Sequence, residues 1–334
     1  MVHVRDGLEQ VIREHAFSGV VRVDLSGHTE LERAYGLADR AFGIPNTLAT
    51  RFGIASGCKG FTALAVMSLV EAGALHLDAT ARSFLGDDLP EVDARVTVEQ
   101  LLAHRSGVGD YFDEEVEGEI TDYVLDVPVH RLATTEGYLP ALAGRAMKFV
   151  PGERFSYCNS GYVILALVLE RATGTPFHDV VEELVCRPAG LVNTAFLRLD
   201  ELPGDTARGY LATDGLRTNV LHLPVRGSGD GGLYSSAGDL HSTWAAVLDG
   251  RIVSEQTVGE MFRPRSEDRE AKARYGLGFW RHESGPAVYL DGYDAGVFFR
   301  SVHDPSQELT WTVLCNSNAG GWPVTQHLIN HFDH

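Results

Sequence analysis

The sequence predicts a mixed α/β protein with one antiparallel sheet, built from both ends of the chain and flanked by helices, and a mainly helical insertion. Strand-like alternating segments gather near both termini, which favours a sheet assembled from the two ends. Residues 75–210 carry mostly helical patterns separated by long loops. The length of 334 residues suits two domains or one large one.

The elements can be assigned in order along the chain. Apolar residues at helical spacing predict a first helix over 4–15, and alternating residues on both sides of Ser26-Gly27 predict a hairpin. A long apolar helix is expected over 57–73, because Gly73 is a typical C-terminal stop. The remaining predicted elements are helices at 97–104, 161–173 and 177–187, strands at 276–280, 287–291, 296–302 and 309–315, and a last helix at 324–332.

The charge balance excludes some classes of partner. The chain has 28 Lys and Arg against 46 Asp and Glu, a formal net charge of −18. Such a charge repels phosphate backbones and anionic lipid, so we expect no nucleic-acid partner and no membrane. The longest apolar stretch, 61–75, contains Glu71 and is too short to span a bilayer. No basic start followed by an apolar core is visible, which predicts a cytoplasmic protein, although a trimmed secreted form would look the same.

The four cysteines predict neither a zinc site nor a disulfide framework. No C-x-x-C pair occurs among Cys58, Cys158, Cys186 and Cys315. A reactive thiolate needs a positive and accessible setting. We therefore expect reduced thiols, with Cys58 and Cys158 as small apolar fillers.

The segment Ser56-Gly57-Cys58-Lys59 opens the long apolar helix. Its i,i+3 spacing places the Ser56 hydroxyl and the Lys59 amine on one helix face, where they can share a proton. Serine is a poor nucleophile until a base takes its proton, and burial lowers the pKa of a lysine enough to make it that base. The helix N-terminus adds backbone N–H groups that suit an oxyanion. The pattern alone is short enough to occur by chance.

A second segment, Tyr157-Cys158-Asn159, precedes another predicted helix. A tyrosine near a lysine cation can lose its proton near neutral pH and serve as general base or acid. The Asn159 side chain offers both a donor and an acceptor to a substrate amide. The competing interpretation is a loop tyrosine followed by an asparagine turn.

Together the two segments resemble the serine β-lactamase and penicillin-binding-protein superfamily. The branch with the greatest similarity contains class C β-lactamases, D,D-peptidases, D-aminopeptidases and family VIII esterases. Further matching text lies at 101–108 (LLAHRSGV), 151–153 (PGE), 159–162 (NSGY), 187–191 (RPAGL) and 231–240 (GGLYSSAGDL). The resemblance covers roughly residues 15–330 and implies a β-lactamase/transpeptidase-like fold. We expect a sheet domain from 1–55 and 215–334, a helical domain from 56–214, and the active site in the cleft between them.

The resemblance also implies roles for individual residues. Ser56 would be the acylated nucleophile, Lys59 its partner base and Tyr157 the general base or acid, with the order of proton transfer left open. Asn159 would hold the carbonyl of the substrate's acyl side chain. The backbone N–H groups of Ser56 and of Tyr293, just after Gly292, would form an oxyanion hole. No metal or organic cofactor is implied.

The chain departs from the family pattern at a third motif. Relatives carry a Lys or His, a hydroxyl residue and a glycine, where this chain has Leu290-Asp291-Gly292. The cation that would bind a substrate carboxylate is therefore missing. The resemblance implies a serine hydrolase acting through an acyl-enzyme on small esters or amides, as an esterase or a D-amino-acid amidase or peptidase. The alternatives are a β-lactamase or D,D-carboxypeptidase, and a degenerate binding or sensor protein; the sequence indicates no oligomeric state.

Overall fold

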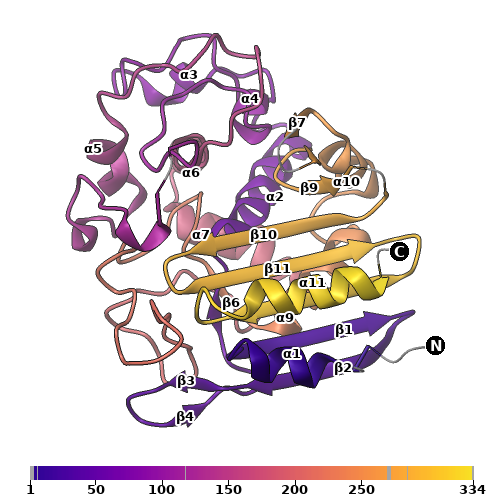
Figure 1. Ribbon diagram of the computed structural model, residues 1–334. Helices are drawn as coiled ribbons and strands as arrows, with labels where there is room; N and C mark the ends of the chain where they lie inside the picture. The colour runs from indigo at the N-terminus through magenta and orange to yellow at the C-terminus, as the bar shows by residue number, and fades with distance from the viewer. Residues whose placement is uncertain (1–3, 6, 117, 269–271, 284, 333–334) are drawn as a thin grey trace.

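The protein is described by a computed structural model that covers residues 4–5, 7–116, 118–268, 272–283 and 285–332. Its centre is an eight-stranded sheet in the order β2-β1-β12-β11-β10-β9-β8-β7, in which every neighbouring pair is antiparallel (Figure 1). The strands are β1 (Gly19–Leu25), β2 (His28–Tyr35), β7 (Ser266–Asp268), β8 (Ala273–Tyr275), β9 (Trp280–His282), β10 (Val288–Asp294), β11 (Val297–Asp304) and β12 (Leu309–Cys315). The predicted fold class, with a sheet built from both ends of the chain, is confirmed.

The helices come from the chain ends and from the long middle segment. They are α1 (Leu8–Glu14), α2 (Cys58–Glu71), α3 (Ala81–Leu85), α4 (Val98–Leu102), α5 (Leu139–Leu142), α6 (Asn159–Thr173), α7 (Phe177–Val181), α8 (Arg187–Ala189), α9 (Ala237–Leu248), α10 (Glu255–Phe262) and α11 (Gly321–Phe332). Two small strand pairs lie beside the main sheet, β3 (Leu37–Asp39) with β4 (Ile44–Pro45) and β5 (Phe52–Gly53) with β6 (Tyr234–Ser235).

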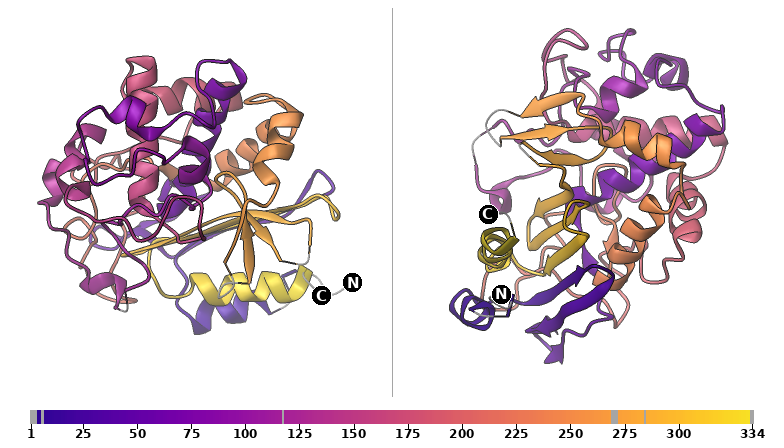
Figure 2. Two further views of the ribbon diagram at one scale, coloured as in Figure 1. Left: turned by 90° about the horizontal axis from the view of Figure 1, so that it is seen from above. Right: turned by 90° about the vertical axis from the view of Figure 1, so that its right-hand side faces the viewer.

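The sheet separates two hydrophobic cores. The terminal helices α1 and α11 lie together on one face, and the remaining larger helices lie on the other (Figure 2). Side chains of β12 alternate between these faces, since Trp311 and Val313 join the core under α1 and α11 while Leu314 joins the core with α2 and α6. This alternation is the period-two pattern of a strand that is covered on both sides.

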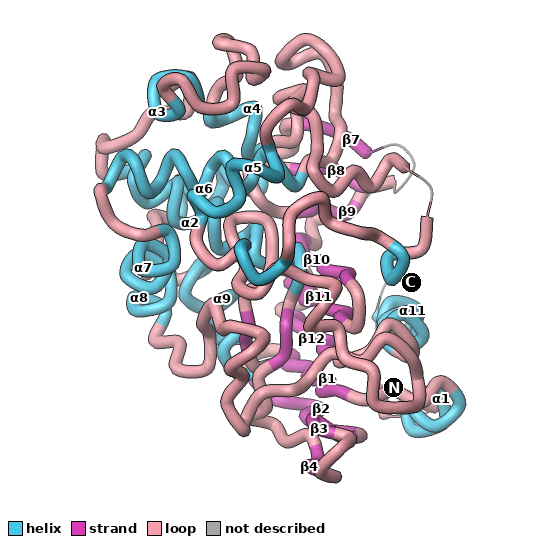
Figure 3. The backbone as a smooth tube through the Cα atoms, turned by 90° about the vertical axis from the view of Figure 1, so that its left-hand side faces the viewer, coloured by secondary structure: helices cyan, strands magenta, loops and turns pink. Residues whose placement is uncertain are grey.

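Helix α2 lies inside the larger core. Every residue from Cys58 to Met67 is buried, as expected of a helix packed on all sides by protein. Figure 3 shows α2 with α6 and α9 on one side of the stacked strands and α11 on the other. The beginning of this helix is thereby held rigidly against the sheet.

Three glycines allow that close packing. A Cβ atom on Gly57 would lie 2.2 Å from Phe299 of β11, and one on Gly60 would lie 2.5 Å from Leu290 of β10. A Cβ atom on Gly292 of β10 would lie 2.1 Å from the backbone oxygen of Ile54. Larger residues at these points would push the sheet and the start of α2 apart.

Most predicted elements are present, with differences near the C-terminal part of the sheet. The predicted strand at 276–280 is wrong, because Gly278 has a φ of +88° and only Trp280 of this segment enters a strand, β9. Strands β7 and β8 and helices α9 and α10 were not predicted from the sequence. The domain boundaries at 55/56 and 214/215 stay a prediction. Within the described residues, no helix has the length and hydrophobicity needed to cross a membrane.

Candidate active site

Ser56 lies in a short 3₁₀ turn, Ala55–Gly57, immediately before α2. The residue before it, Ala55, has a φ of +43°, a left-handed conformation that is uncommon for a residue with a side chain. Such strained positions gather where a fold must present one residue in a fixed orientation. Ser56 is half-buried and lines a large cleft, so its hydroxyl can reach a bound molecule.

Lys59 is almost fully buried, with 1% of its surface exposed, directly below Ser56. Its Nζ donates hydrogen bonds to Ser56 Oγ at 2.8 Å, to Asn159 Oδ1 at 2.7 Å and to the backbone oxygen of Asp230 at 2.8 Å. Three acceptors match the three N–H donors of an ammonium group. The lysine therefore joins three segments of chain at one charged nitrogen.

Tyr157 completes the group around the serine. Its phenol forms a hydrogen bond with Ser56, and the centre of its ring lies 4.8 Å from Lys59 Nζ. The ring contacts His104 at 4.3 Å between centroids and stacks on Trp280 at 6.0 Å. Burial raises the pKa of Tyr157 well above its usual value. This shift is opposite in direction to the effect expected of a nearby lysine cation, because the loss of solvation is the larger effect. The role of Tyr157 as general base or acid stays a prediction.

Asn159 lies at the first position of α6, where both hydrogens of its amide are already engaged. Its Nδ2 donates to the backbone oxygen of Phe112 at 2.9 Å and to Glu114 Oε1 at 3.1 Å, while Oδ1 accepts from Lys59. In this arrangement Asn159 orients the lysine rather than offering a free amide to a substrate. Its predicted role in holding an acyl carbonyl stays a prediction that requires the contact with Glu114 to open.

The Leu290-Asp291-Gly292 segment forms the middle of β10, beside the turn Ala55–Gly57 that carries Ser56. Leu290 is buried and faces Gly60 of α2, whereas its neighbour Asp291 lines the cleft. Gly292 and Tyr293 line the cleft with Ser56. Strand β9 pairs with β10 only at Val288 and Tyr289, so later N–H groups of β10 on that side face the cleft.

Sequence reasoning missed three acidic residues around this site. Asp110 accepts hydrogen bonds from the backbone N–H groups of Asn159 at 2.7 Å and Ser160 at 2.8 Å, and so fixes the start of α6. Burial raises the pKa of Asp110 to about 6. Glu114 holds Asn159, and Asp230 supplies a backbone oxygen to Lys59.

The glycines of loop 227–232, which carries Asp230, are the sequence feature that could have indicated this part of the site. A Cβ atom on Gly229 would lie 2.1 Å from the backbone oxygen of Tyr162 in α6, and the oxygen of Gly229 accepts from Thr62 of α2 at 2.7 Å. The glycines of this loop allow the backbone to pack between two helices. Their spacing resembles a dinucleotide fingerprint, but their use here is close packing.

The cleft in front of Ser56, called the outer cleft below, is wide and acidic. It has a volume of about 1330 Å³. Its walls carry aromatic rings, among them Tyr157 and Trp280, and the carboxylates of Glu114, Glu115, Glu153, Glu267, Asp268 and Asp291. Arg154 is the cationic residue among its described lining residues, and Arg154 Nη1 lies 3.5 Å from Glu115 Oε1. The outer cleft therefore presents a negative surface to an entering molecule.

All four cysteines are free and buried. Burial raises the pKa of Cys58 and Cys158, which keeps both thiols protonated. This matches the prediction that they fill space in the core. Across the described parts of the chain, no three His, Cys, Asp or Glu side chains gather in a way that could hold a metal ion.

Comparison with known proteins places this site in a family. A D-aminopeptidase from Brucella anthropi is 30% identical over 335 residues, covering 93% of this chain and 58% of the relative. Esterase EstB from Burkholderia gladioli is 34% identical over 205 residues, covering 57% of this chain and 50% of the relative. The chain thus spans between half and three fifths of the length of these two relatives.

A solved structure agrees over a larger share. The penicillin-binding protein from Bacillus halodurans has a TM-score of 0.90 and 36% identity, with 97% of this chain and all of that one covered. The family model described as Beta-lactamase matches residues 4–333. Since this match takes in nearly the whole sequence, together with the Ser56, Lys59 and Tyr157 cluster, the chain belongs to the beta-lactamase family.

Proposed function

We propose that this protein is a serine hydrolase that forms an acyl-enzyme on Ser56 with small esters or amides. The observation that carries the proposal is the 2.8 Å hydrogen bond from Lys59 Nζ to Ser56 Oγ, at the wall of the outer cleft. Relatives named D-aminopeptidase and esterase support the same class of reaction. A serine activated by a buried lysine is the means by which such a reaction starts.

The reaction proceeds in two balanced halves. Ser56 Oγ attacks the substrate carbonyl carbon, and its proton passes to the pair formed by Lys59 and Tyr157. The oxygen of the tetrahedral intermediate is held by the backbone N–H groups of Ser56 and Tyr293. The leaving oxygen or nitrogen takes the proton from the pair as its bond to carbon breaks. Water then adds to the acyl carbon and gives a proton to the pair. The bond between that carbon and Ser56 Oγ breaks, Oγ takes the proton back, and the acid product is released.

The pair must lose a proton before it can act as a base. Lys59 donates all three of its hydrogen bonds, and the raised pKa of Tyr157 keeps its phenol protonated at neutral pH. The reactive form is therefore a minor form, lacking one proton that is shared between the two residues. The base is therefore the pair of residues, and neither Lys59 nor Tyr157 alone.

The charges of the outer cleft favour substrates that lack a carboxylate. A β-lactam or a peptide C-terminus would need a cation, and Arg154 already lies near Glu115. Arg300 of β11 lies opposite Asp291 in the sheet, with its Nη2 3.5 Å from Asp291 Oδ2, and its side chain is mostly buried. Neutral or cationic esters and amides are therefore the proposed substrates, ahead of penicillins and D,D-peptides.

The test is covalent labelling followed by intact-mass measurement. A fluorophosphonate should add one label to the wild-type chain, and Ser56→Ala should abolish it. Ser156→Ala is the matched control, because Ser156 lines the same cleft but donates its hydroxyl to Glu115 at 2.6 Å. The control should label normally. A label that persists in Ser56→Ala, or no label on the wild type, would contradict the proposal.

A parallel assay separates the candidate substrate classes. A 4-nitrophenyl ester should be hydrolysed with a larger kcat/KM than a penicillin. Faster turnover of the penicillin would favour a β-lactamase instead. Labelling without turnover of any ester, amide or penicillin would favour a binding or sensor protein.

A further inference from the structure

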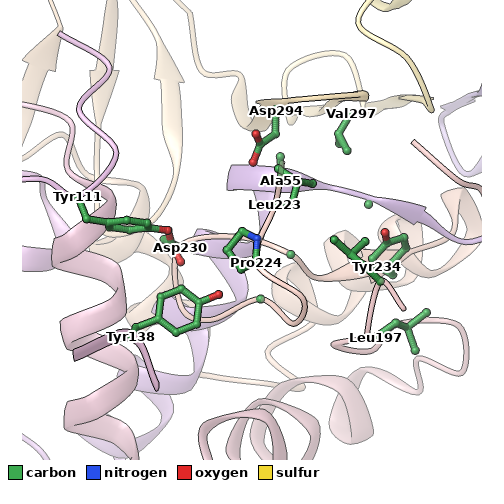
Figure 4. Close-up of a pocket in the computed structure, with 15 residues that line it drawn as sticks. Ala55, Tyr111, Tyr138, Leu197, Leu223, Pro224, Asp230, Tyr234, Asp294 and Val297 are labelled. Atoms are coloured by element: carbon green, nitrogen blue, oxygen red, sulfur yellow. The ribbon is translucent and has the colours of Figure 1, made fainter. Parts of the chain in front are cut away.

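A second hollow lies beside the turn Ala55–Gly57 that carries Ser56, and we call it the inner cavity. Its volume is about 50 Å³, and its lining includes Ala55, Asp230 and Asp294 (Figure 4). These three residues also line an adjoining hollow of about 40 Å³ whose wall contains Ser56 and Asn159. The adjoining hollow therefore shares walls with the inner cavity on one hand and contains Ser56 on the other.

Much of the inner cavity is apolar. Its lining includes Leu197, Leu199, Leu223, Pro224 and Val297. At 10–15 Å³ for each water-sized group, the cavity has room for about four such groups. A chain of a few atoms attached to an acyl carbon on Ser56 is a fitting occupant in size.

Two carboxylates interrupt this apolar lining. Asp230 is 8% exposed and accepts one hydrogen bond from the hydroxyl of Tyr111 at 2.6 Å, on Oδ2. The backbone N–H groups of Asp230 and Gly231 also hydrogen-bond to this carboxylate. No described side chain donates to its other oxygen. Asp294 Oδ1 accepts from the N–H of Ala295 at 2.8 Å, and the carboxylate is directed toward the cavity in Figure 4.

The described residues around these two carboxylates carry too little positive charge to balance both negative charges. Lys59 is the cation whose charge acts on both, but its three donors are used by Ser56, Asn159 and the backbone of Asp230. Glu114 adds a further negative charge nearby, and burial together with these neighbours raises the pKa of Asp294 to about 7. Carboxylates in an apolar enclosure are costly unless a cation compensates them. A bound ligand can provide that cation.

We propose that the inner cavity is the acyl-binding subsite and that it takes a short acyl chain ending in a primary ammonium group, held by Asp230 and Asp294. This inference rests on the proposed acyl-enzyme, since the acyl carbon must be bonded to Ser56. The ammonium supplies three N–H donors, which suits the carboxylates of Asp230 and Asp294 and the hydroxyl of Tyr111 or Tyr138, all of which line the cavity. The apolar wall packs the methylene groups between the carbonyl and the nitrogen.

The test uses two substrates that differ only at the end of the acyl chain. β-Alanyl 4-nitroanilide ends in an ammonium group where butanoyl 4-nitroanilide ends in a methyl group, so the two have the same length. Each kcat/KM is divided by the rate of uncatalysed hydrolysis, because the ammonium also activates the carbonyl. At about pH 8 the amine is still protonated and Asp294 is ionised.

The corrected ratio should favour the β-alanyl substrate by about ten- to a hundredfold, the range expected for a charged hydrogen bond. Asp294→Asn and Asp230→Asn should each lower that ratio about tenfold. Because the ratio is taken within one variant, partial loss of folded protein does not affect it. Glu267→Gln is the matched control, as Glu267 is an exposed carboxylate of the outer cleft, and it should retain the ratio.

The outcomes separate this inference from the proposed function. A wild-type ratio near one, or a ratio unchanged in both aspartate variants, would overturn the amine subsite while leaving ester and amide hydrolysis intact. A ratio that falls equally in Glu267→Gln would assign the preference to the outer cleft and overturn the inference too. Failure of the fluorophosphonate to label Ser56 would instead contradict the acyl-enzyme itself.

Discussion

The outer cleft is lined by Ser56 itself and the inner cavity by the neighbouring Ala55, and both spaces carry carboxylates. The outer cleft has about 1330 Å³ of open space, whereas the inner cavity has about 50 Å³. A carboxylate exposed in the wide cleft is solvated and screened, so it acts mainly on how a charged molecule approaches. A carboxylate in the small cavity keeps its full interaction with a bound group. Carboxylates therefore attract charged molecules toward the outer cleft, whereas in the inner cavity they select which group can be bound.

Lys59 and Tyr157 both hydrogen-bond to Ser56, and removing them should give the largest effect. We expect Lys59→Ala and Tyr157→Phe each to lower kcat by about 10²–10⁴, the range for loss of general acid–base catalysis. The double variant should lose little more, because residues that act as a unit are not additive. Steady-state kinetics with 4-nitrophenyl butanoate is the measurement.

Lys148→Ala is the control for this cycle, since the Lys148 amine bonds Asp113 at 2.7 Å and does not contact Ser56. It should retain most activity. Losses from Lys59→Ala and Tyr157→Phe that multiply fully in the double variant would show that the two residues act separately.

The pH dependence of kcat/KM should report the proton that the pair must lose. Burial raises the pKa of Tyr157, so the phenol is protonated at neutral pH, and the deprotonated, active form of the pair grows as pH rises. We expect kcat/KM for a neutral ester to increase with pH, by up to about tenfold per pH unit below the macroscopic pKa. Tyr157→Phe should displace this rise. A profile that falls between neutral and alkaline pH would have the wrong sign for this assignment.

Filling the inner cavity should change the preference for acyl-chain length without closing the outer cleft. Val297 is buried and lines the cavity, so Val297→Phe should place a ring in it. We expect turnover of 4-nitrophenyl butanoate relative to the acetate to fall about tenfold, as in pockets that distinguish one or two methylenes. Val297→Ala, which enlarges the cavity, should not lower the ratio. Equal losses on both esters would indicate that the acyl chain lies in the outer cleft.

Salt should give the smallest effect and the sharpest comparison of the two sets of carboxylates. Raising NaCl from low concentration to about 0.5 M shortens the Debye length to a few ångströms and screens exposed charges. The β-alanyl to butanoyl ratio should change by less than about threefold, because Asp230 is buried. A ratio that falls to one at high salt would assign the preference to the outer cleft.

Local patterns predicted the elements that carry the catalytic group. The i,i+3 spacing of Ser56 and Lys59 depends on helix geometry alone, and the apolar run that follows predicts a buried helix. Alternating segments near both termini predicted β1, β10, β11 and β12. The segment 276–280 failed because a glycine in a left-handed conformation ends the extended chain before Trp280.

Protonation and hydrogen-bond partners were not predictable in the same way. The pKa of Tyr157 depends on how much water the fold removes from the phenol, and a sequence pattern does not contain that quantity. Asn159 is engaged by Phe112 and Glu114, which lie 47 and 45 residues away along the chain. A contact over such a separation is decided by loop packing rather than by local spacing.

The sequence by itself determined the fold class and the family resemblance, and it predicted the serine, lysine and tyrosine that the structure brings together. The tertiary structure alone decided which hydrogen-bond partners these three residues have and where the acidic residues lie. It places Asp230 and Asp294, far apart in sequence, on the wall of one cavity beside Ser56. The physical reason is that helix and strand periodicities act over a few residues, whereas burial and charge interactions depend on segments that only the folded chain brings together.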